Sequence, residues 1–401
     1  MKKRNLHIFT AYYPGSRFEV YMDNEIKYLS TEFSEVTIYP GLKNDEKRDI
    51  PANCKVVYLS DDPAFAVSSF KLVFLFPSII TRLLLSEIRE HGIKKVWLNK
   101  SFIKKYLFHQ LRIFHCLKGR INNKHDVYYS NWSVDASLTL ALLKKKGLIH
   151  SFVMRAHRYD LYDEEFPTGF IPFRKFQQDH VKYIASISQD GIKYLNERFP
   201  DLKNKVVLHR LGTSDNGISV WKPENSIRIV SCSNIKKVKR LHLLAEALKF
   251  CNCKMEWHHF GDGELKDQIT AIAETFPKEI SYKIYGRIPS QDLFDFYRKN
   301  YISLFINVSA SEGIPVSIME AVSFGIPVLA TDVGGTSEII SDMTGKLMDK
   351  NIQPRELAAL IISENEKWAD AQKREMIRKY WKENYSAEKC FPPFARMLSE
   401  S

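Results

Sequence analysis

Short apolar runs alternate along the chain with longer segments whose apolar residues recur at helical spacing. In the first half, the predicted strands cover residues 6–9, 35–39, 127–129, 151–154 and 183–187. The predicted helices of this half cover residues 18–31, 134–146 and 189–198. Such alternation is typical of a parallel sheet with helices on both faces.

The second half of the chain repeats this alternation. Its predicted strands cover residues 227–230, 255–260, 282–285, 302–306 and 328–330. Its predicted helices cover residues 241–250, 264–275, a stretch beginning near 318, and a long run over about 368–399. Residues 211–226 are rich in turn formers and are predicted to be an interdomain linker. We therefore expect an α/β protein with two Rossmann-like domains and a cleft between them.

Two carboxylates stand eight positions apart in the segment Ser311–Glu320, at Glu312 and Glu320. Glu312 follows a predicted strand and lies in a loop, whereas Glu320 lies in the next helix. Such loops meet at the carboxyl ends of parallel strands, where ligands bind, and helix N-termini suit phosphate. Carboxylates accept hydrogen bonds from hydroxyls. The segment therefore predicts a nucleotide-sugar site.

This segment resembles the Glu-x7-Glu signature of the retaining family-4 glycosyltransferases, and the continuation Gly325–Glu338 is similar to the same family. The resemblance is specific over residues 226–350 and weaker over 5–220. It implies the GT-B fold, with two Rossmann-like domains facing a central cleft. The implied parts are an acceptor-binding domain over 1–210, the linker, a nucleotide-sugar domain over 227–379, and a C-terminal helix over about 380–401 that packs back on the first domain.

By this resemblance, Glu312 holds hydroxyls of the donor hexose, and Glu320 holds those of the ribose. Lys239 stabilises the negative charge of the leaving diphosphate. The position of a family arginine, five residues before Lys239, is occupied by Asn234. The candidates to replace its charge are Lys236, Lys237 and Arg240. The other implied donor contacts are Gly15, Gly286, Arg287, Ile288 and the backbone N–H groups of Gly313, Ile314 and Val316.

The segment Arg155–Tyr162 resembles the family's histidine motif. His157 is therefore expected near the transferred sugar, and with Glu312 and Lys239 it completes the candidate catalytic set. A purely structural histidine is the alternative. Arg158 and Asp160 are expected to orient this loop or to contact the acceptor.

The loop 12–19 follows the first predicted strand and contains Gly15, where the backbone can approach a ligand closely. In the family this loop lines the cleft. Glu19 and Glu25 match residues found in relatives, and the alternative for each is a charge on a helix surface.

Composition limits the class of protein. The 401 residues suffice for two domains, and a hydrophobic content of 44% with 26% charged residues is that of a globular protein. The six cysteines show no paired Cys-x2-Cys spacing, so we expect no metal site, and no cofactor beyond the donor. Few cysteines and no signal peptide after the basic start Met1–Arg4 favour a cytoplasmic protein.

The net charge of +12 is concentrated. Residues 91–125 hold nine Lys/Arg and no Asp or Glu. Over 101–118 the apolar residues gather on one helical face, and Lys104, Lys105 and Arg112 lie on the other. A basic amphipathic helix is typical of a segment at an anionic membrane surface. The alternative is a surface helix packed on its own core. Nucleic acid is not expected as a partner, because no nucleic-acid motif accompanies the charge.

Residues 64–85 are strongly apolar but contain Lys71, Pro77 and Arg82. These breaks predict two short helices rather than a membrane span. One side of them is expected to contact lipid or the helix at 101–118.

The sequence as a whole predicts a retaining glycosyltransferase that moves a sugar from a nucleotide diphosphate sugar to a glycan or lipid-linked acceptor. The expected setting is capsule, O-antigen or exopolysaccharide synthesis at the inner face of a bacterial membrane. The alternatives are a GT-B sugar-nucleotide epimerase and a non-catalytic nucleotide-sugar-binding protein, which the Asn234 departure keeps open.

Overall fold

A computed structural model describes residues 3–15, 19–43, 48–121, 123–222 and 224–401. The chain forms two compact units: unit 1 comprises Met1–Arg210 and Phe391–Ser401, and unit 2 comprises Leu211–Cys390. Parts of three predicted features lie outside the described residues. They are Met1 and Lys2 of the basic start, residues 16–18 of the loop after the first strand, and residue 223 of the linker.

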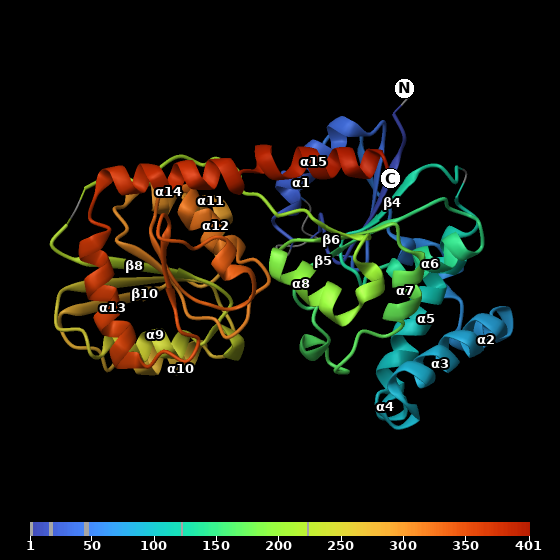
Figure 1. Cartoon of the computed structure of the whole chain (residues 1–401), viewed down its shortest axis with the longest axis horizontal. Helices are drawn as coiled ribbons and strands as arrows, with labels where there is room; N and C mark the ends of the chain where they lie inside the picture. The colour runs from blue at the N-terminus through green and yellow to red at the C-terminus, as the bar shows by residue number, and fades with distance from the viewer. Residues whose placement is uncertain (1–2, 16–18, 44–47, 122, 223) are drawn as a thin grey trace. The chain divides into compact units, whose positions relative to one another are not determined.

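Unit 1 is built on a seven-stranded sheet in the order β3-β2-β1-β4-β5-β6-β7 (Figure 1). Its paired strands are parallel. The strands are β1 (Leu6–Thr10), β2 (Val36–Pro40), β3 (Cys54–Val56), β4 (Val127–Ser130), β5 (Val153–Ala156), β6 (Tyr183–Ser186) and β7 (Val206–Leu208). All five strands predicted for the first half are present, and β3 and β7 are additional.

The helices of unit 1 cover both faces of this sheet. They are α1 (Met22–Glu32), α2 (Ser69–Leu75), α3 (Pro77–His91), α4 (Ile93–Leu98), α5 (Lys100–Leu117), α6 (Ser137–Lys145), α7 (Arg174–His180) and α8 (Gln189–Arg198). Alternate strand residues face opposite cores. Ile8 packs in one core with α1 residues and Phe394, whereas Phe9 packs in the other with residues of α5 and α6. This is why the buried strands are apolar at almost every position.

The region 64–118 forms two short helices followed by α4 and α5, and the prediction of two helices is confirmed. Of the two interpretations of the helix at 101–118, the structure supports the surface helix whose apolar face packs on its own core. Ile103, Leu107 and Leu111 of α5 are at most 2% exposed and lie in the core of unit 1. The amphipathic pattern came from burial within the fold.

Unit 2 is built on a six-stranded sheet in the order β10-β9-β8-β11-β12-β13, again with parallel pairs. The strands are β8 (Ile227–Cys232), β9 (Met255–Phe260), β10 (Ile280–Ile284), β11 (Leu304–Asn307), β12 (Val328–Thr331) and β13 (Gly345–Met348). The helices are α9 (Leu241–Leu248), α10 (Lys266–Ala273), α11 (Ser290–Lys299), α12 (Val316–Ser323), α13 (Pro354–Lys367) and α14 (Ala371–Asn384). The strands predicted for this half are all present, and β13 is additional.

The long helical run predicted over 368–399, and with it the single C-terminal helix over about 380–401, is wrong in its boundaries. α14 ends at Asn384, and α15 (Ala387–Ser399) begins after a break. Thr213 causes the break, because its N–H donates to the Tyr385 carbonyl and its own carbonyl accepts from the Ala387 N–H. Beyond the break, Phe391–Ser401 packs in unit 1.

In the part of the chain that the structure describes, no single helix is long and apolar enough to cross a membrane. α2 and α3 together pass that test on length and composition, but they are bent by 96° where they meet.

Candidate functional site

The candidate donor residues gather at one point of the sheet in unit 2. β8 and β11 are neighbours, but the chain leaves them in opposite directions along the sheet, toward β9 and toward β12. Such a switch point leaves room between the loops that follow the two strands. The loop after β8 carries Lys239, and the loop after β11 carries Glu312.

Lys239 and Glu312 form an ion pair, with 2.6 Å between Nζ and Oε1. The Glu312 side chain is 8% exposed and that of Lys239 is 24% exposed. Asn307 at the end of β11 donates from Nδ2 to the same carboxylate oxygen at 3.2 Å. The two residues that the sequence separates by 73 positions are therefore brought into contact.

Burial alone would raise the pKa of Glu312. The charge of Lys239, together with hydrogen bonds from Lys239, Ser309 and Asn307, outweighs it and lowers the pKa. Glu312 is therefore ionised at neutral pH. A buried carboxylate held in this state accepts hydrogen bonds from hydroxyls, and its partner Lys239 is fixed beside it.

The loop between Glu312 and α12 leaves backbone donors unused. None of the N–H groups of Gly313, Ile314 and Val316 donates a hydrogen bond within the described residues. They precede or begin α12, whose first N–H groups have no partner inside the helix. Gly334 supports this loop closely: its φ is +52°, and a Cβ there would lie 1.9 Å from the Glu312 carbonyl oxygen. Only glycine fits this contact.

Glu320 lies on α12 and is half-buried. Desolvation raises its pKa to about 7. Its charge also raises the pKa of Cys232 at the end of β8 and of Tyr297 on α11, in each case after the larger effect of burial. The Tyr297 hydroxyl is buried and has no hydrogen-bond partner among the described residues. Tyr297 thus presents an unsatisfied hydroxyl near Glu320 on the β8 side of the switch point.

Of the three cations expected to replace the charge of the family arginine at Asn234, one is already used elsewhere. Arg240 is not available to replace the family arginine, because its guanidinium donates to the carbonyls of Val308, Ser309 and Lys350. It has φ +46° and ties the loop after β8 to the loop after β11. Asn234 and the two lysines at 236 and 237 are exposed.

The segment Gly286–Ile288 follows β10. Gly286 accepts a hydrogen bond from the Gly261 N–H at 2.9 Å and has φ +70°. Arg287 is exposed, and Ile288 is half-buried. The segment therefore lies two strands from β8, at the same end of the sheet as Lys239.

In unit 1, His157 follows β5 and is 5% exposed. Its ring lies 4.1 Å from that of Trp132 and 5.5 Å from that of Tyr21, measured between centroids. Both ring nitrogens are buried without a hydrogen-bond partner among the described residues. Nδ1 is 3.8 Å from an Asp160 oxygen, too far for a hydrogen bond. An imidazole left in this state suits a polar ligand.

Asp160 orients the loop that carries His157. One carboxylate oxygen accepts the His157 N–H at 2.8 Å, and the other accepts the Ser133 N–H at 2.5 Å. This buried arrangement accounts for the orienting role, one of the two that we expected. Arg158 is half-buried and pairs with Glu165 at 2.5 Å.

Neither Glu19 nor Glu25 is a charge on a helix surface, so the alternative given for both residues is wrong. Glu19 precedes α1 with φ +57°, is 7% exposed, and accepts hydrogen bonds from five N–H groups. The donors are the backbone of Ala11, Tyr12 and Tyr13 and the side chains of Asn131 and Trp132. Glu25 forms a fully buried ion pair with Arg155.

Glu19 therefore fixes the ring that covers His157. Trp132 Nε1 donates to Glu19 Oε1 at 2.6 Å, and Asn131 Nδ2 bridges Glu19 to the Tyr21 hydroxyl. Asn131 and Trp132 follow β4, the neighbour of β1 at the switch point of this sheet. Their position at this switch point was the signal from which the sequence could have identified Asn131 and Trp132.

Asp135 was also missed. Burial, with smaller effects from Glu19 and Asp160, raises its pKa well above the ordinary value. Its Oδ2 is buried without a hydrogen-bond partner among the described residues. Gly15 is buried at the end of the loop after β1, and its N–H donates to the Tyr12 carbonyl.

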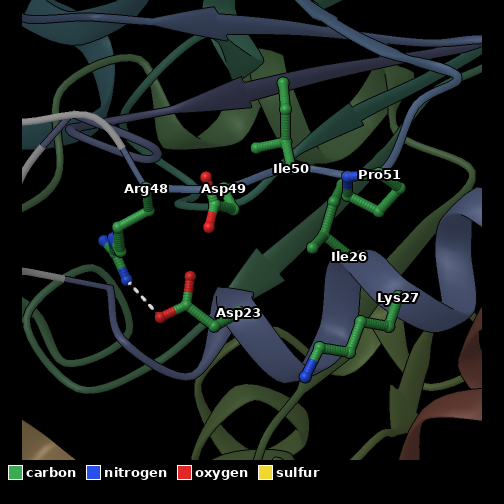
Figure 2. Close-up of a pocket in the computed structure, with 7 residues that line it drawn as sticks. All are labelled: Asp23, Ile26, Lys27, Arg48, Asp49, Ile50 and Pro51. Atoms are coloured by element: carbon green, nitrogen blue, oxygen red, sulfur yellow. Dashed lines mark hydrogen bonds and ion pairs between the residues drawn. The ribbon is translucent and has the colours of Figure 1, made fainter.

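A pocket lies elsewhere in unit 1. It has a volume of about 590 Å³ and is lined by α1 and residues 48–51. Figure 2 shows Asp23 and Arg48 on its wall, joined by an ion pair of 2.8 Å. It contains none of the predicted site residues. A second pocket, lined in part by Lys104, Lys105 and Arg112, is considered below.

Comparison with known proteins gives a family match in the second half of the chain. Residues 218–384 match the family described as glycosyl transferases group 1. The match includes Lys239, Glu312 and Glu320.

The whole chain resembles solved glycosyltransferases in fold. It matches HepE of Anabaena, solved in complex with UDP, at a TM-score of 0.69, with 16% identity and full coverage of both chains. It matches the lipopolysaccharide outer core galactosyltransferase WaaB at a TM-score of 0.71, with 14% identity over 99% of this chain and 100% of that one. The fold is GT-B.

Among curated proteins, the chain is similar to the putative colanic acid biosynthesis glycosyltransferase WcaL of Escherichia coli. The two are 26% identical over 56% of this chain and 58% of WcaL. It is also 28% identical to the putative teichuronic acid biosynthesis glycosyltransferase TuaC of Bacillus subtilis, over 33% of this chain and 30% of TuaC. The matches thus span less than two thirds of these relatives' lengths.

Proposed function

We propose that this protein is a retaining glycosyltransferase of the family-4 type, which transfers a hexose from a nucleotide diphosphate sugar to a glycan or lipid-linked acceptor. The observation that carries the proposal is the Lys239–Glu312 pair at the switch point of unit 2, beside the open N–H groups that begin α12. A cation, a buried anion and free backbone donors match the diphosphate and the sugar hydroxyls of such a donor.

In this proposal Glu312 holds hexose hydroxyls, and Glu320 holds those of the ribose. The N–H groups of Gly313, Ile314 and Val316 bind the sugar-phosphate, and Gly286–Ile288 contacts the base. Lys239 neutralises charge on the departing diphosphate, which favours the transition state over the bound substrate. The ion pair with Glu312 keeps Lys239 in place before the donor arrives, so little reorganisation is required.

Unit 1 would supply the acceptor side through His157 and Arg158, and Gly15 in the loop after β1 would contact the donor. His157 has two ring nitrogens without partners, so it can accept a hydroxyl proton or donate to a sugar oxygen. Retention without an enzyme nucleophile fits attack from the side of the leaving phosphate. No metal ion is required, because Lys239 and the backbone supply the positive potential, and we expect turnover to persist in a chelator.

Relatives named for colanic acid and teichuronic acid biosynthesis support a role in bacterial surface polysaccharide assembly. In this proposal the protein acts in the cytoplasm, peripheral to the inner membrane face. HepE was solved with UDP, which makes a uridine nucleotide the first donor to test.

The test is calorimetric titration of UDP, GDP and ADP into wild type, Glu320→Ala and Glu274→Ala, the last an exposed carboxylate on the same unit. One nucleotide should bind wild type and the Glu274 control equally and the Glu320 variant weakly. NMR of the transfer product should then show that the anomeric configuration of the sugar is retained, which completes the assignment. Absence of nucleotide binding by folded protein would contradict the proposal. Product from donor alone would indicate an epimerase, and binding without turnover would indicate a non-catalytic protein.

A further inference from the structure

Exposed large apolar side chains are concentrated on α2, α3 and α4. Eight of the seventeen such side chains in the described part of the chain lie within residues 70–98. They are Phe70, Val73, Phe74, Leu75, Leu85, Ile93, Trp97 and Leu98. Phe70 is 74% exposed and Trp97 is 62% exposed. A concentration of this kind marks an interaction surface rather than chance exposure.

These helices are apolar on two sides. The inward side carries Leu72, Leu83 and Val96, which are buried in the core of unit 1 together with residues of α5. The outward side carries the exposed set. Figure 1 shows α2, α3 and α4 at one margin of unit 1, next to α5. The fold of this unit is therefore complete without covering the outward residues.

The same region is strongly basic. Residues 69–118 contain ten Lys/Arg and two acids, Glu87 and Glu90. Glu87 is 1% exposed, and burial raises its pKa to about 8, so it adds little negative charge. The exposed cations include Lys71, Arg82, Lys94, Lys100, Lys104 and Lys105. The Lys100 ammonium lies 4.0 Å from the Trp97 ring centroid, so cation and aromatic residue share one surface.

A basic pocket adjoins this apolar surface. It has a volume of about 330 Å³ and is lined by Ser69, Ser101, Lys104, Lys105, Phe108 and Arg112. Arg112 is fixed in its wall, because it donates to the Val67 carbonyl at 3.1 Å and to Ser69 Oγ at 3.0 Å. The lining contains three cationic side chains, two hydroxyls and no acid, a donor set that suits a phosphate group. Ser69 directly precedes Phe70, so the pocket meets the exposed apolar set.

We infer that α2–α4 and this pocket dock on an anionic lipid bilayer. Phe70, Phe74 and Trp97 enter the boundary between head groups and acyl chains. Lys104, Lys105 and Arg112 bind a lipid phosphate beside them. The sequence already offered lipid contact for residues 64–85 and for the cations of 101–118, and the structure adds α4 to the apolar contacts in place of the apolar face of α5.

The charge of this surface favours a lipid bilayer over a second copy of the chain as its partner. A second copy of the chain would bring two strongly basic surfaces together, which is repulsive. The centres of protein interfaces are depleted in lysine, whereas a basic rim around aromatic side chains is typical of interfacial membrane binding. The inference does not depend on the proposed function, because vesicle binding requires no turnover.

The experiment is co-sedimentation of the full chain with vesicles of phosphatidylcholine alone and of equal parts phosphatidylcholine and phosphatidylglycerol. The decisive variant is Phe70→Ser/Phe74→Ser/Trp97→Ser, with Met343→Ser/Met376→Ser as the matched control on exposed sites of unit 2. The second variant is Lys104→Gln/Lys105→Gln, with Lys299→Gln/Lys346→Gln as its control. Nucleotide titration and thermal unfolding of every variant report the fold and the donor site separately.

Wild type and both controls should bind the anionic vesicles and bind phosphatidylcholine weakly. The aromatic variant should bind at least about tenfold more weakly, since three large side chains leave the lipid boundary. The lysine variant should lose several-fold and show a weaker salt dependence. The inference is overturned if wild type ignores anionic vesicles, if the aromatic variant binds like wild type, or if the aromatic substitutions only dissolve a dimer of the free protein.

Discussion

The two units have sheets with the same opening strand order, yet their buried carboxylates are used in opposite ways. Glu19 in unit 1 accepts five N–H groups and has no cationic partner among the residues that the structure describes, whereas Glu312 in unit 2 is held chiefly by one lysine. The five donors fix Glu19 to its own loop and to the end of β4. The single lysine leaves Glu312 with spare acceptor capacity and places a cation beside it. The first arrangement fixes the local structure, and the second leaves two charged groups able to bind a ligand.

The largest effect is expected from Lys239→Ala, which removes the cation beside Glu312. The substitution leaves Glu312 buried without its cation, which should cost about 3 kcal/mol of stability. If Lys239 also stabilises the leaving group, transfer should fall by about a hundredfold to a thousandfold. Steady-state kinetics and urea unfolding measure the two effects, with the exposed Lys278→Ala of the same unit as the control. Equal loss in both variants would show that the pair has no particular role.

Glu19→Gln tests the structural role of the hydrogen bonds that Glu19 accepts. The amide has one NH₂ where the carboxylate accepts five donors, so we expect a loss of about 2–3 kcal/mol in the free energy of unfolding. Urea denaturation monitored by tryptophan fluorescence gives the value, and Glu197→Gln on exposed α8 is the control. Donor binding should be unchanged, because Glu19 belongs to unit 1. A variant as stable as wild type, or one that binds nucleotide poorly, would remove the distinction between the two carboxylates.

Glu320 sharpens the comparison through pH. Its pKa is raised from 4.5 to about 7 in the folded chain, so the folded state binds the proton more tightly than the unfolded state. Stability should therefore decrease as the pH rises from about 4.5 to about 7, by about 1 kcal/mol after solvent screening. Glu320→Gln should remove this loss. Thermal unfolding at pH 5 and pH 8 measures it, and identical pH profiles for variant and wild type would contradict the assignment.

The smallest effect is expected from Asn234→Arg, which supplies the arginine that the family resemblance implies at this position. The position is exposed, and Arg240 is already committed to three carbonyls. The added guanidinium should tighten binding of a nucleoside diphosphate by about threefold to tenfold and leave nucleoside binding unchanged. Asn234→Gln is the control for size. Unchanged diphosphate affinity would mean that another cation already occupies this role.

Much of the fold was predictable because its strands are buried on both faces and so are apolar in short unbroken runs. β3 was missed, since its three residues are partly exposed and give no such run. The break between α14 and α15 was missed for a different reason. Tyr385 and Ser386 are not helix breakers, whereas α15 continues through Pro392 and Pro393. The break depends on Thr213, far away in sequence, which no local pattern records.

The two candidate sites also differ in how far the sequence could predict them. Glu312 and Glu320 lie within one contiguous segment, so a motif could identify them together. The surroundings of His157 draw on Glu19, Trp132 and Asp160, which the sequence separates by tens of residues. The helix at 101–118 shows the limit of amphipathic patterns, because they reveal an apolar face without saying whether protein or lipid covers it.

The return of the chain to unit 1 has a consequence for biosynthesis. Phe394 lies 4.0 Å from the Arg155 guanidinium, above the buried pair that Arg155 forms with Glu25, and it also packs on Tyr129. The ribosome makes these residues only after the whole of unit 2. Unit 1 therefore cannot complete its core before unit 2 has been made, in contrast to the usual order in which the N-terminal domain finishes folding first. Until then the Arg155–Glu25 pair lacks the cover that Phe394 gives it.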